Sequence, residues 1–279
     1  MTNSFSEVVQ VTQDYYDSTD ADVFYSSIWG GEDIHIGLYE SEEDTVYEAS
    51  RRTVQRVASF AQGQLGEDSK VLDIGAGYGG ASRYLAKEFG CHVTSLNLSE
   101  VENKKNRKLC LDQGLHRLVD VAFGSFEAIP FEDESFDLVW SQDAILHSGN
   151  REKVVQEVSR VLKKGGRFLF TDIMQSDDCP ENVLQPILDR IHLQSLGSPA
   201  FYTQAAQKFS LEKLGFDDQT AQIANHYAKV LRETELRQAE LEQKVNKDYL
   251  ERMKVGLQHW VDGGNKGHLS WGIFQFQKK

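Results

Sequence analysis

The stretch VLDIGAGYGGAS, residues 71–82, constrains the fold of this chain more than any other part of its sequence. A short apolar run is followed by Gly75, Gly77 and Gly80 in the spacing G-x-G-x-x-G. Glycine permits positive φ angles and a close approach of a ligand to the backbone, and the start of the following helix attracts anionic groups. The pattern therefore predicts a strand, a tight turn and a helix, with a ligand at the turn. A turn that binds nothing is the alternative, because the spacing alone is weakly specific.

Short apolar runs alternate with segments of helical periodicity on both sides of this turn. The predicted strands are residues 70–74, 92–96, 118–122, 136–140 and 168–171, and the predicted helices are residues 45–62, 80–89, 99–113 and 151–163. This order is typical of a parallel, doubly wound α/β sheet.

The last third of the chain departs from this alternation. A further strand is predicted at residues 219–223. Residues 226–260 carry apolar side chains near every fourth position, which predicts a packed lid helix, with a coiled coil as the alternative. Residues 268–276 alternate between apolar and polar, which predicts a terminal antiparallel strand at or near the sheet edge.

Composition excludes several classes of partner. The net charge of −13 argues against nucleic-acid binding, because phosphate contacts need clustered Lys and Arg. No apolar stretch reaches the roughly 18 residues of a membrane helix, and no signal peptide is evident. The three cysteines are scattered without a CxxC or HExxH motif, so no metal is expected. We expect a cytoplasmic protein, and a monomer.

Asp73 helps to choose the ligand of the glycine turn. It lies two residues before Gly75, where a carboxylate would repel the two phosphates of NAD. S-adenosylmethionine carries no phosphate but has an ammonium group, which a carboxylate at the strand end would attract. Asp73 therefore favours S-adenosylmethionine, and an NAD-binding oxidoreductase is the less favoured reading.

Several segments together resemble the class I S-adenosylmethionine-dependent methyltransferases. VLDIGAGYGG is similar to the first motif of that family, and VLKKGGRFLFTDIM (161–174) to its fifth strand with the preceding turn. LEKLGF (211–216) and the ending WGIFQFQKK fit the same pattern. The resemblance implies a Rossmann-like fold with a mostly parallel seven-stranded sheet, an antiparallel C-terminal strand, and a helical cap and lid.

The same resemblance implies a set of donor-binding residues. VTSLNLSE (93–100) is similar to the strand end where an acid usually holds the ribose hydroxyls, but this chain has an amide there. GSFEAIPF (124–131) resembles the turn that holds adenine. The implied donor contacts are Asp73, Gly75, Gly77, Asn97, Ser125, Phe126, Gln142 and His35.

Two stretches narrow the resemblance to the small-amine N-methyltransferases. WSQDAILHS (140–148) and FYSSIWGGEDIHIGLYE (24–40) are similar to the sarcosine/dimethylglycine N-methyltransferases, which make glycine betaine. A looser likeness runs to the phosphoethanolamine methyltransferases. In those enzymes the Asp and His of the D-A-I-L-H element, with an N-terminal Tyr, serve the active site. The resemblance thus implies that Asp143 and His147 serve the active site, together with Tyr16 or Tyr25.

The chemistry of amine methylation agrees with this choice of residues. The amine must lose its proton before it attacks, and His147 is a candidate acceptor. Asp143 is expected to hold the substrate nitrogen or to orient His147, and its alternative role is a helix N-cap. A methylated amine is a cation, which favours aromatic neighbours. The candidate substrate contacts are Tyr16, Tyr25, Trp29, Trp140 and Met174.

The sequence thus predicts a domain organisation and a main function. Residues 1–45 are expected to cap the donor site, and residues 46–279 to form the methyltransferase domain, with lid insertions at about 176–202 and 225–267. The carboxylate of a dimethylglycine substrate needs a basic partner, and four remain open: Arg190, His192, Lys254 and Lys266. The main hypothesis is N-methylation of sarcosine and dimethylglycine with S-adenosylmethionine. The alternatives are a phosphoethanolamine-type methyltransferase, the oxidoreductase, and a non-catalytic binding protein.

Overall fold

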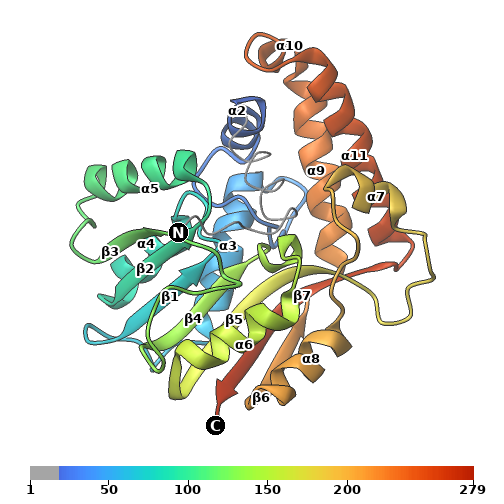
Figure 1. Ribbon diagram of the computed structural model, residues 1–279. Helices are drawn as coiled ribbons and strands as arrows, with labels where there is room; N and C mark the ends of the chain where they lie inside the picture. Colours follow the sequence, from blue (N-terminus) through green and yellow to red (C-terminus); the bar gives the residue numbers. More distant parts are fainter. Residues whose placement is uncertain (1–18) are drawn as a thin grey trace, which may run out of the picture.

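Seven strands form one sheet in the computed structural model, which describes residues 19–279. Their order is β3-β2-β1-β4-β5-β7-β6 (Figure 1). The parallel strands are β1 (Lys70–Ile74), β2 (His92–Asn97), β3 (Val119–Phe123), β4 (Phe136–Gln142) and β5 (Leu162–Gln175). β7 (Leu269–Lys278) runs antiparallel between β5 and β6 (Leu211–Asp218). The mostly parallel seven-stranded sheet with an antiparallel C-terminal strand is confirmed.

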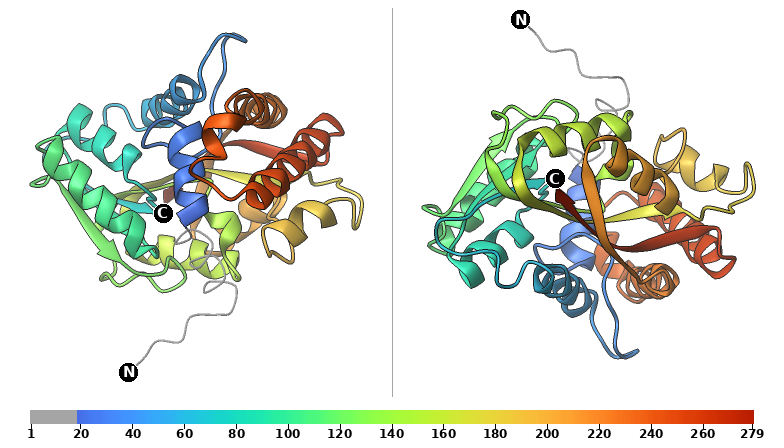
Figure 2. Two further views of the ribbon diagram at one scale, coloured as in Figure 1. Left: turned by 90° about the horizontal axis from the view of Figure 1, so that it is seen from above. Right: turned by 90° about the horizontal axis from the view of Figure 1, so that it is seen from below.

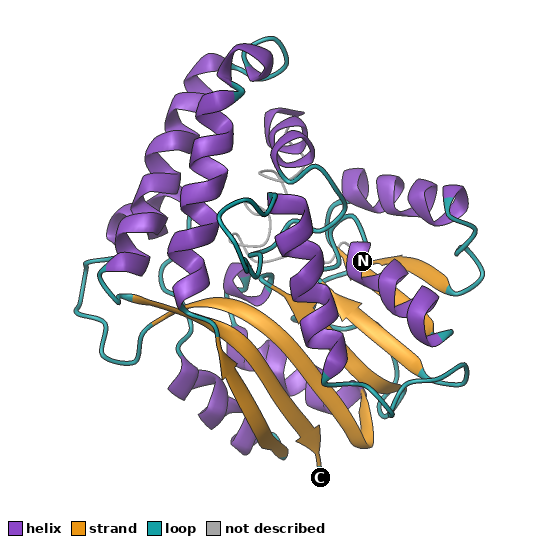
Figure 3. Ribbon diagram, turned by 180° about the vertical axis from the view of Figure 1, so that it is seen from behind, coloured by secondary structure: helices purple, strands orange, loops and turns teal. Residues whose placement is uncertain are grey.

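Amphipathic helices cover both faces of this sheet (Figure 3). On one face, α3 (Val46–Ser59), α4 (Gly80–Phe89) and α5 (Glu100–Asp112) share an apolar core with β1, β2 and β4. On the other, α6 (Arg151–Val161) and α8 (Pro199–Lys208) pack against the same strands and against β5 and β7. The carboxyl ends of the parallel strands stay clear of these two layers, which is where such sheets bind ligands.

Another group of helices gathers above those carboxyl ends. Seen from above, α2 crosses the centre of the molecule (Figure 2), and α9 and α11 stand side by side beyond β7 (Figure 1). Two further apolar clusters join these helices to the sheet and to each other. The members of this upper group are α2 (Thr19–Ile28), η1 (Ile145–His147), α7 (Gln185–Arg190), α9 (Ala221–Leu236), α10 (Gln238–Leu241) and α11 (Lys247–Asn265).

Three predictions about the second half of the chain were wrong in detail. Residues 219–223 are not a strand: β6 has already ended at Asp218, whose Oδ1 accepts the N–H of Thr220 at 3.0 Å just before α9 begins. Residues 226–260 form neither a single helix nor a coiled coil. They comprise the end of α9, the short α10 and most of α11, and α9 and α11 pack on each other. β5 begins at Leu162 rather than at residue 168, and Gly165, with a φ of 78°, lies at an irregularity in that strand between the pairs Phe136–Leu162 and Leu138–Arg167.

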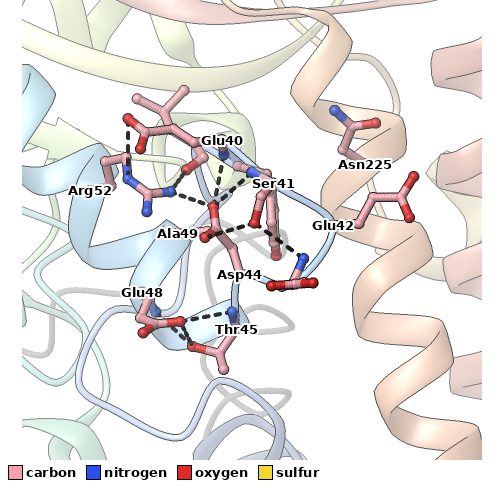
Figure 4. A network of polar contacts seen from close by, with 12 residues as sticks. Glu40, Ser41, Glu42, Asp44, Thr45, Glu48, Ala49, Arg52 and Asn225 are labelled. Carbon is pink, nitrogen blue, oxygen red and sulfur yellow. Dashed lines mark hydrogen bonds and ion pairs between the residues drawn. The ribbon is translucent and has the colours of Figure 1, made fainter.

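A polar network fixes the segment that leads into α3 (Figure 4). Arg52 Nη1 donates to Asp44 Oδ2 at 2.8 Å, and Arg52 Nε lies 3.5 Å from Glu40 Oε1. Asp44 Oδ2 also accepts the backbone N–H of Glu40 at 2.8 Å. At the start of α3, Thr45 and Glu48 exchange hydrogen bonds as a capping box. The network therefore holds one end of the loop that crosses the carboxyl edge of the sheet.

Candidate active site

Two cavities meet at the carboxyl edge of the sheet. The glycine-turn cavity, of about 110 Å³, lies over β1, β2 and β4, and the aromatic cavity, of about 90 Å³, lies beneath α2, α7, α9 and α11. Ile34, His35, Asp143 and His147 line both. A molecule in one cavity is therefore separated from a molecule in the other by only a few side chains.

Glycine is required at the turn between β1 and α4. Gly75 and Gly77 both line the glycine-turn cavity and have φ angles of 73° and 53°, which L side chains rarely adopt. A Cβ atom on Gly75 would lie 2.4 Å from the Cβ of Ala144. The sequence motif thus forms the predicted strand, turn and helix, and its bare backbone forms part of the cavity wall.

Asp73 is buried beside this turn. Its Oδ2 accepts a hydrogen bond of 2.6 Å from Ser82, whose hydroxyl in turn accepts one of 2.7 Å from Ser95. Burial raises the pKa of Asp73 to about 7, and the nearby Asp33 carboxyl adds to the rise while Ser82 and Arg83 oppose it. A cation in the glycine-turn cavity would stabilise the charged carboxylate, whereas a pyrophosphate would not.

Asn97 at the end of β2 has an acidic partner that sequence reasoning missed. Asn97 Nδ2 donates to Glu102 Oε2 at 2.8 Å, and both residues line the glycine-turn cavity. Ser99 and Glu102 have the spacing of a capping box, which assigns the glutamate a purely helical role. Ser99 does accept the Glu102 N–H at 3.1 Å. The Glu102 carboxylate nevertheless bonds the Asn97 amide, and so places an acid at the strand end where Asn97 lacks one.

The predicted adenine-side residues divide into two groups. Phe126 and Gln142 line the glycine-turn cavity, and Gln142 Nε2 is a buried donor with no hydrogen-bond partner among the described residues. Ser125 does not line that cavity, and its Oγ accepts the N–H of Glu127 at 3.1 Å. Ser125 therefore shapes the turn that presents Phe126.

The loop between α2 and α3 closes over the glycine turn. Asp33 Oδ2 lies 2.9 Å from Arg51, and Glu32 pairs with the buried Arg83 at 2.6 Å. A Cβ on Gly80 would lie 2.1 Å from Asp33 Oδ1, so the loop rests directly on the start of α4. Burial raises the pKa of Asp33 to about 6. Together with Asp73 and Glu102, these residues make the cavity wall acidic.

His35 belongs to the same loop and is held by α3. Ser50 donates to the His35 carbonyl at 3.0 Å, and Thr53 donates to the Ile36 carbonyl at 2.8 Å while accepting the N–H of Leu38 at 3.1 Å. His35 Nε2 is buried without a hydrogen-bond partner in residues 19–279. Burial lowers the pKa of His35 to about 4, so the ring is neutral at pH 7.

Asp143 anchors the loop to the sheet. Its carboxylate accepts the Ile36 N–H at 2.8 Å, the Thr171 hydroxyl at 2.8 Å and the Trp271 indole N–H at 2.7 Å. Burial raises its pKa, although His35 and these three donors oppose the rise. The N-cap alternative was wrong: Asp143 has a φ of 48°, and Ala144 precedes η1 without a side-chain cap.

His147 ends η1 and lies in the wall that the two cavities share. Burial lowers its pKa to about 4, and the neighbouring Arg151 lowers it further. The η1 turn is fixed from below, because Asp172 Oδ1 accepts the N–H of Leu146 at 2.9 Å. His147 is thus a neutral imidazole at the end of a hydrogen-bonded turn, and it lines both cavities.

The aromatic cavity is built from more rings than the sequence indicated. Tyr25 and Trp29, both predicted, line it with their ring centroids 5.2 Å apart. Tyr227 and Trp260 were missed; their rings stack at 5.1 Å and 14° across α9 and α11. His226, with a pKa that burial lowers to about 3, completes this wall. Tyr227 and Trp260 were missed because their spacing in the sequence is the same as that of many core residues on a helix. They come together only because α9 and α11 pack side by side.

Two predicted residues lie elsewhere. Met174 does not line the aromatic cavity, because side chains alternate along β5: Ile173 faces the cavity and Met174 lies in the core beneath the sheet. Trp140 lines the glycine-turn cavity and donates to Gln142 Oε1 at 3.1 Å. Tyr16 lies outside the described residues.

Two other kinds of feature are absent from the described part of the chain. No group of three or more His, Cys, Asp or Glu side chains in residues 19–279 could hold a metal ion. No helix in that range is both long enough and apolar enough to span a membrane.

Known proteins share this fold and sequence. A family model described as a methyltransferase domain matches residues 72–170. The chain is 55% identical over 98% of its length to the sarcosine/dimethylglycine N-methyltransferase of Halorhodospira halochloris, 97% of which is covered. It is 52% identical over 97% of its length to that of Aphanothece halophytica, 98% of which is covered.

A solved structure agrees with these sequence matches. A crystal structure from Galdieria sulphuraria, of a protein assigned as a sarcosine dimethylglycine methyltransferase, matches with a TM-score of 0.90 and 43% identity. The match covers 95% of this chain and 99% of that one. The chain therefore belongs to the family of the S-adenosylmethionine-dependent sarcosine/dimethylglycine N-methyltransferases.

Proposed function

We propose that this chain methylates sarcosine and dimethylglycine with S-adenosylmethionine and so forms glycine betaine. Identities above 50% over almost the whole chain to enzymes named for these substrates support the assignment. The observation that carries it is the pair of joined cavities: an acidic one at the glycine turn and an aromatic one beside it. A sulfonium donor with an ammonium group suits the first, and a small methylated amine suits the second.

In this proposal, the residues of the glycine-turn cavity hold the donor. Asp73 binds the ammonium group. Gly77 offers its backbone N–H to the donor carboxylate, while Gly75, whose own N–H donates to the Leu96 carbonyl at 2.8 Å, leaves space for the donor beside the turn. Asn97 and Glu102 together hold the ribose hydroxyls. Three more residues complete the donor site: Phe126 against the adenine, Gln142 with its unpaired amide N–H, and His35 from the covering loop.

The helices and loops above the sheet supply the enclosure. We propose that residues 1–45 cap the donor site, that residues 46–279 form the catalytic domain, and that about 176–202 and 225–267 form a lid. Such an enclosure excludes water from the reacting atoms. The bound donor supplies a methyl group on a positively charged sulfur, and the protein aligns the amine with it.

The amine must first lose a proton. For an amine with a pKa near ~10, the neutral form costs about 4 kcal/mol at pH 7. Burial in the aromatic cavity disfavours the ammonium and so lowers this cost. His147 is neutral at pH 7 and lies in the shared wall, which lets it accept a hydrogen bond or the proton from the amine, although a pKa lowered to about 4 makes it a weaker base than a free imidazole. Tyr25 and Trp29 face the cationic product.

Two alternatives have less support. A phosphorylated amine carries up to two negative charges, yet Arg190 is the only Lys or Arg among the described residues that line the aromatic cavity. NAD requires a place for its pyrophosphate, but the described lining of the glycine-turn cavity includes five acids and no Lys or Arg.

The test is methyl transfer from labelled S-adenosylmethionine to glycine, sarcosine, dimethylglycine and phosphoethanolamine, measured side by side. We expect label in betaine from sarcosine and dimethylglycine. His147→Gln should reduce kcat by about 100-fold or more without lowering Tm, because it removes the proton acceptor. Label only in the phosphorylated amine would contradict the substrate assignment. Equal turnover by His147→Gln would remove the proposed role of that residue.

A further inference from the structure

We infer that Arg190, the last residue of α7, binds the carboxylate of the substrate and that Gly256 of α11 provides the space for its side chain. The inference rests on the proposed function, because it presupposes an amino-acid substrate. Of the four basic residues that the sequence left open, only Arg190 and His192 line the aromatic cavity. His192 is exposed, whereas Arg190 is half-buried.

The other two candidates are engaged elsewhere. Lys254 Nζ pairs with Glu251 at 2.6 Å and donates to Gln238 at 3.3 Å. Lys266 lines a separate surface hollow between α7 and α11. Neither side chain lines the aromatic cavity.

Helix α11 makes room for Arg190. The arginine side chain passes so close to Gly256 that a Cβ on this glycine would lie 2.1 Å from Arg190 Nε and 2.2 Å from Arg190 Cδ. Gly256 lies inside a helix, where alanine is ordinarily preferred. The glycine therefore has a steric reason to be there, and that reason is the path of Arg190.

The guanidinium group retains most of its hydrogen-bonding capacity. Its Nη2 lies 2.7 Å from the sulfur of Met253, and a thioether is a weak acceptor. No carboxylate of residues 19–279 lies within 4 Å of it, although the chain has 43 Asp and Glu against 30 Lys and Arg. Other arginines of the chain, such as Arg51, Arg83 and Arg160, do have acidic partners. Arg190 thus presents an unpaired cation to the cavity.

The chemistry of the substrate fits this arrangement. In sarcosine and dimethylglycine, one methylene carbon separates the amine nitrogen from the carboxylate, so both charged groups must fit in the same cavity. A planar guanidinium binds a carboxylate through two parallel hydrogen bonds. With the carboxylate on Arg190, the amine is left to face the shared wall of Asp143 and His147.

The test compares Arg190→Gln, Gly256→Ala and Arg252→Gln with the parent protein. Arg252 is the matched control, because it lies on the exposed side of α11. Binding of dimethylglycine to the protein loaded with S-adenosylhomocysteine is measured by calorimetry, alongside kcat and KM. Arg190→Gln should raise Kd and KM for dimethylglycine by about 10- to 100-fold, with a much smaller change in kcat and no change in S-adenosylhomocysteine binding. Arg252→Gln should match the parent.

Gly256→Ala tests whether the position of the Arg190 side chain matters. It keeps the charge of Arg190 but displaces the side chain, so Kd for dimethylglycine should rise by several-fold at an unchanged or higher Tm. N,N-dimethylethanolamine, which carries a hydroxymethyl group in place of the carboxylate, should bind the parent and Arg190→Gln equally. This comparison assigns the effect to the carboxylate.

Three outcomes would overturn the inference. Equal binding of dimethylglycine by the parent and Arg190→Gln would remove the role of Arg190 and leave the proposed function intact. An unchanged Kd in a folded Gly256→Ala would remove the role of the glycine. A parent protein that neither binds nor methylates dimethylglycine would overturn both the inference and the proposed function.

Discussion

Among single residues, Asp73 connects the pH of the solution to donor binding. Its pKa is raised to about 7, and the groups that face it are Asp33, Ser82 and Arg83. Only the charged carboxylate attracts an ammonium group, so the affinity for S-adenosylhomocysteine should increase as pH rises from about 5.5 to 8. Binding below pH 7 should also release protons. Calorimetry in buffers of different ionisation enthalpy measures both effects.

Asp73→Asn is the control for this prediction. The amide still accepts the Ser82 hydroxyl but does not titrate, so the variant should bind more weakly and with a flatter pH profile. If the variant kept the same pH slope as the parent, the titrating group would be Asp33, whose pKa is raised to about 6.

The residues of the site differ in how far the sequence predicted them. Asp73, Gly75 and Gly77 were predicted correctly as part of the strand and turn, since their roles depend on neighbours in sequence. Glu102 was missed because its spacing from Ser99 already had a complete local explanation as a helix cap. Arg190 was left among four candidates because its distinguishing feature, a glycine 66 positions later in α11, depends on how two distant helices pack.

Among the helices, α3 holds the covering loop through buried hydroxyls, and Thr53 makes two of these contacts. Thr53 Oγ1 donates to the Ile36 carbonyl and accepts the Leu38 N–H. Thr53→Val keeps the shape but leaves both backbone groups without this partner, at a cost of about 1–3 kcal/mol. We expect a lower free energy of unfolding and weaker S-adenosylhomocysteine binding, measured by chemical denaturation and calorimetry.

Thr45→Ala separates loop anchoring from helix stability. It removes the capping box that Thr45 and Glu48 form at the start of the same helix (Figure 4). Loss of such a cap costs about 1 kcal/mol. Donor affinity should remain that of the parent, because Thr45 is exposed and does not line either cavity. Equal losses of donor affinity in the two variants would mean that α3 acts only through overall stability.

The helices and strands were predictable where residues within or next to the segment mark its ends. The parallel strands were found because apolar runs end at glycines or at polar turns. The break between α9 and α11 was missed because residues 237–246 contain neither glycine nor proline, so the helical pattern continues through the turn. The turn depends instead on the Asn246 side chain, which caps α11 by accepting the N–H groups of Asp248 and Tyr249.

At the scale of the whole molecule, buried and exposed carboxyls predict opposite responses to pH. Burial raises the pKa of Asp33 to about 6 and those of Asp73 and Asp172 to about 7. These groups bind protons more tightly in the folded than in the unfolded state. The stability that they contribute is therefore present at low pH and is lost as pH rises through about 6 to 7.

Exposed carboxyls that pair with arginine act in the other direction. Hydrogen bonds from Arg52 and from Arg237 hold the pKa values of Asp44 and Glu240 at about 2. Their stabilising contribution is present above their unfolded pKa values, near 4, and is lost as pH falls toward 2.

The buried His35, His147 and His226 oppose the buried acids, because their pKa values are lowered to about 4, 4 and 3 and their neutral rings gain stability as pH rises toward 6.5. The free energy of unfolding should therefore be nearly flat from about pH 5 to 6 and should fall on either side.

Salt separates the burial effect from the repulsion among surface charges. The net charge of −13 adds self-repulsion that also grows as pH rises, but about 0.5 M NaCl screens exposed charges and leaves buried carboxyls nearly unaffected. Above pH 6, salt should therefore raise Tm without abolishing its decline toward pH 8. Asp172→Asn, which keeps an acceptor for the Leu146 N–H, should reduce the part of the decline that persists in salt. A decline that salt removes completely would assign the pH dependence to the surface and contradict the raised pKa values of the buried acids.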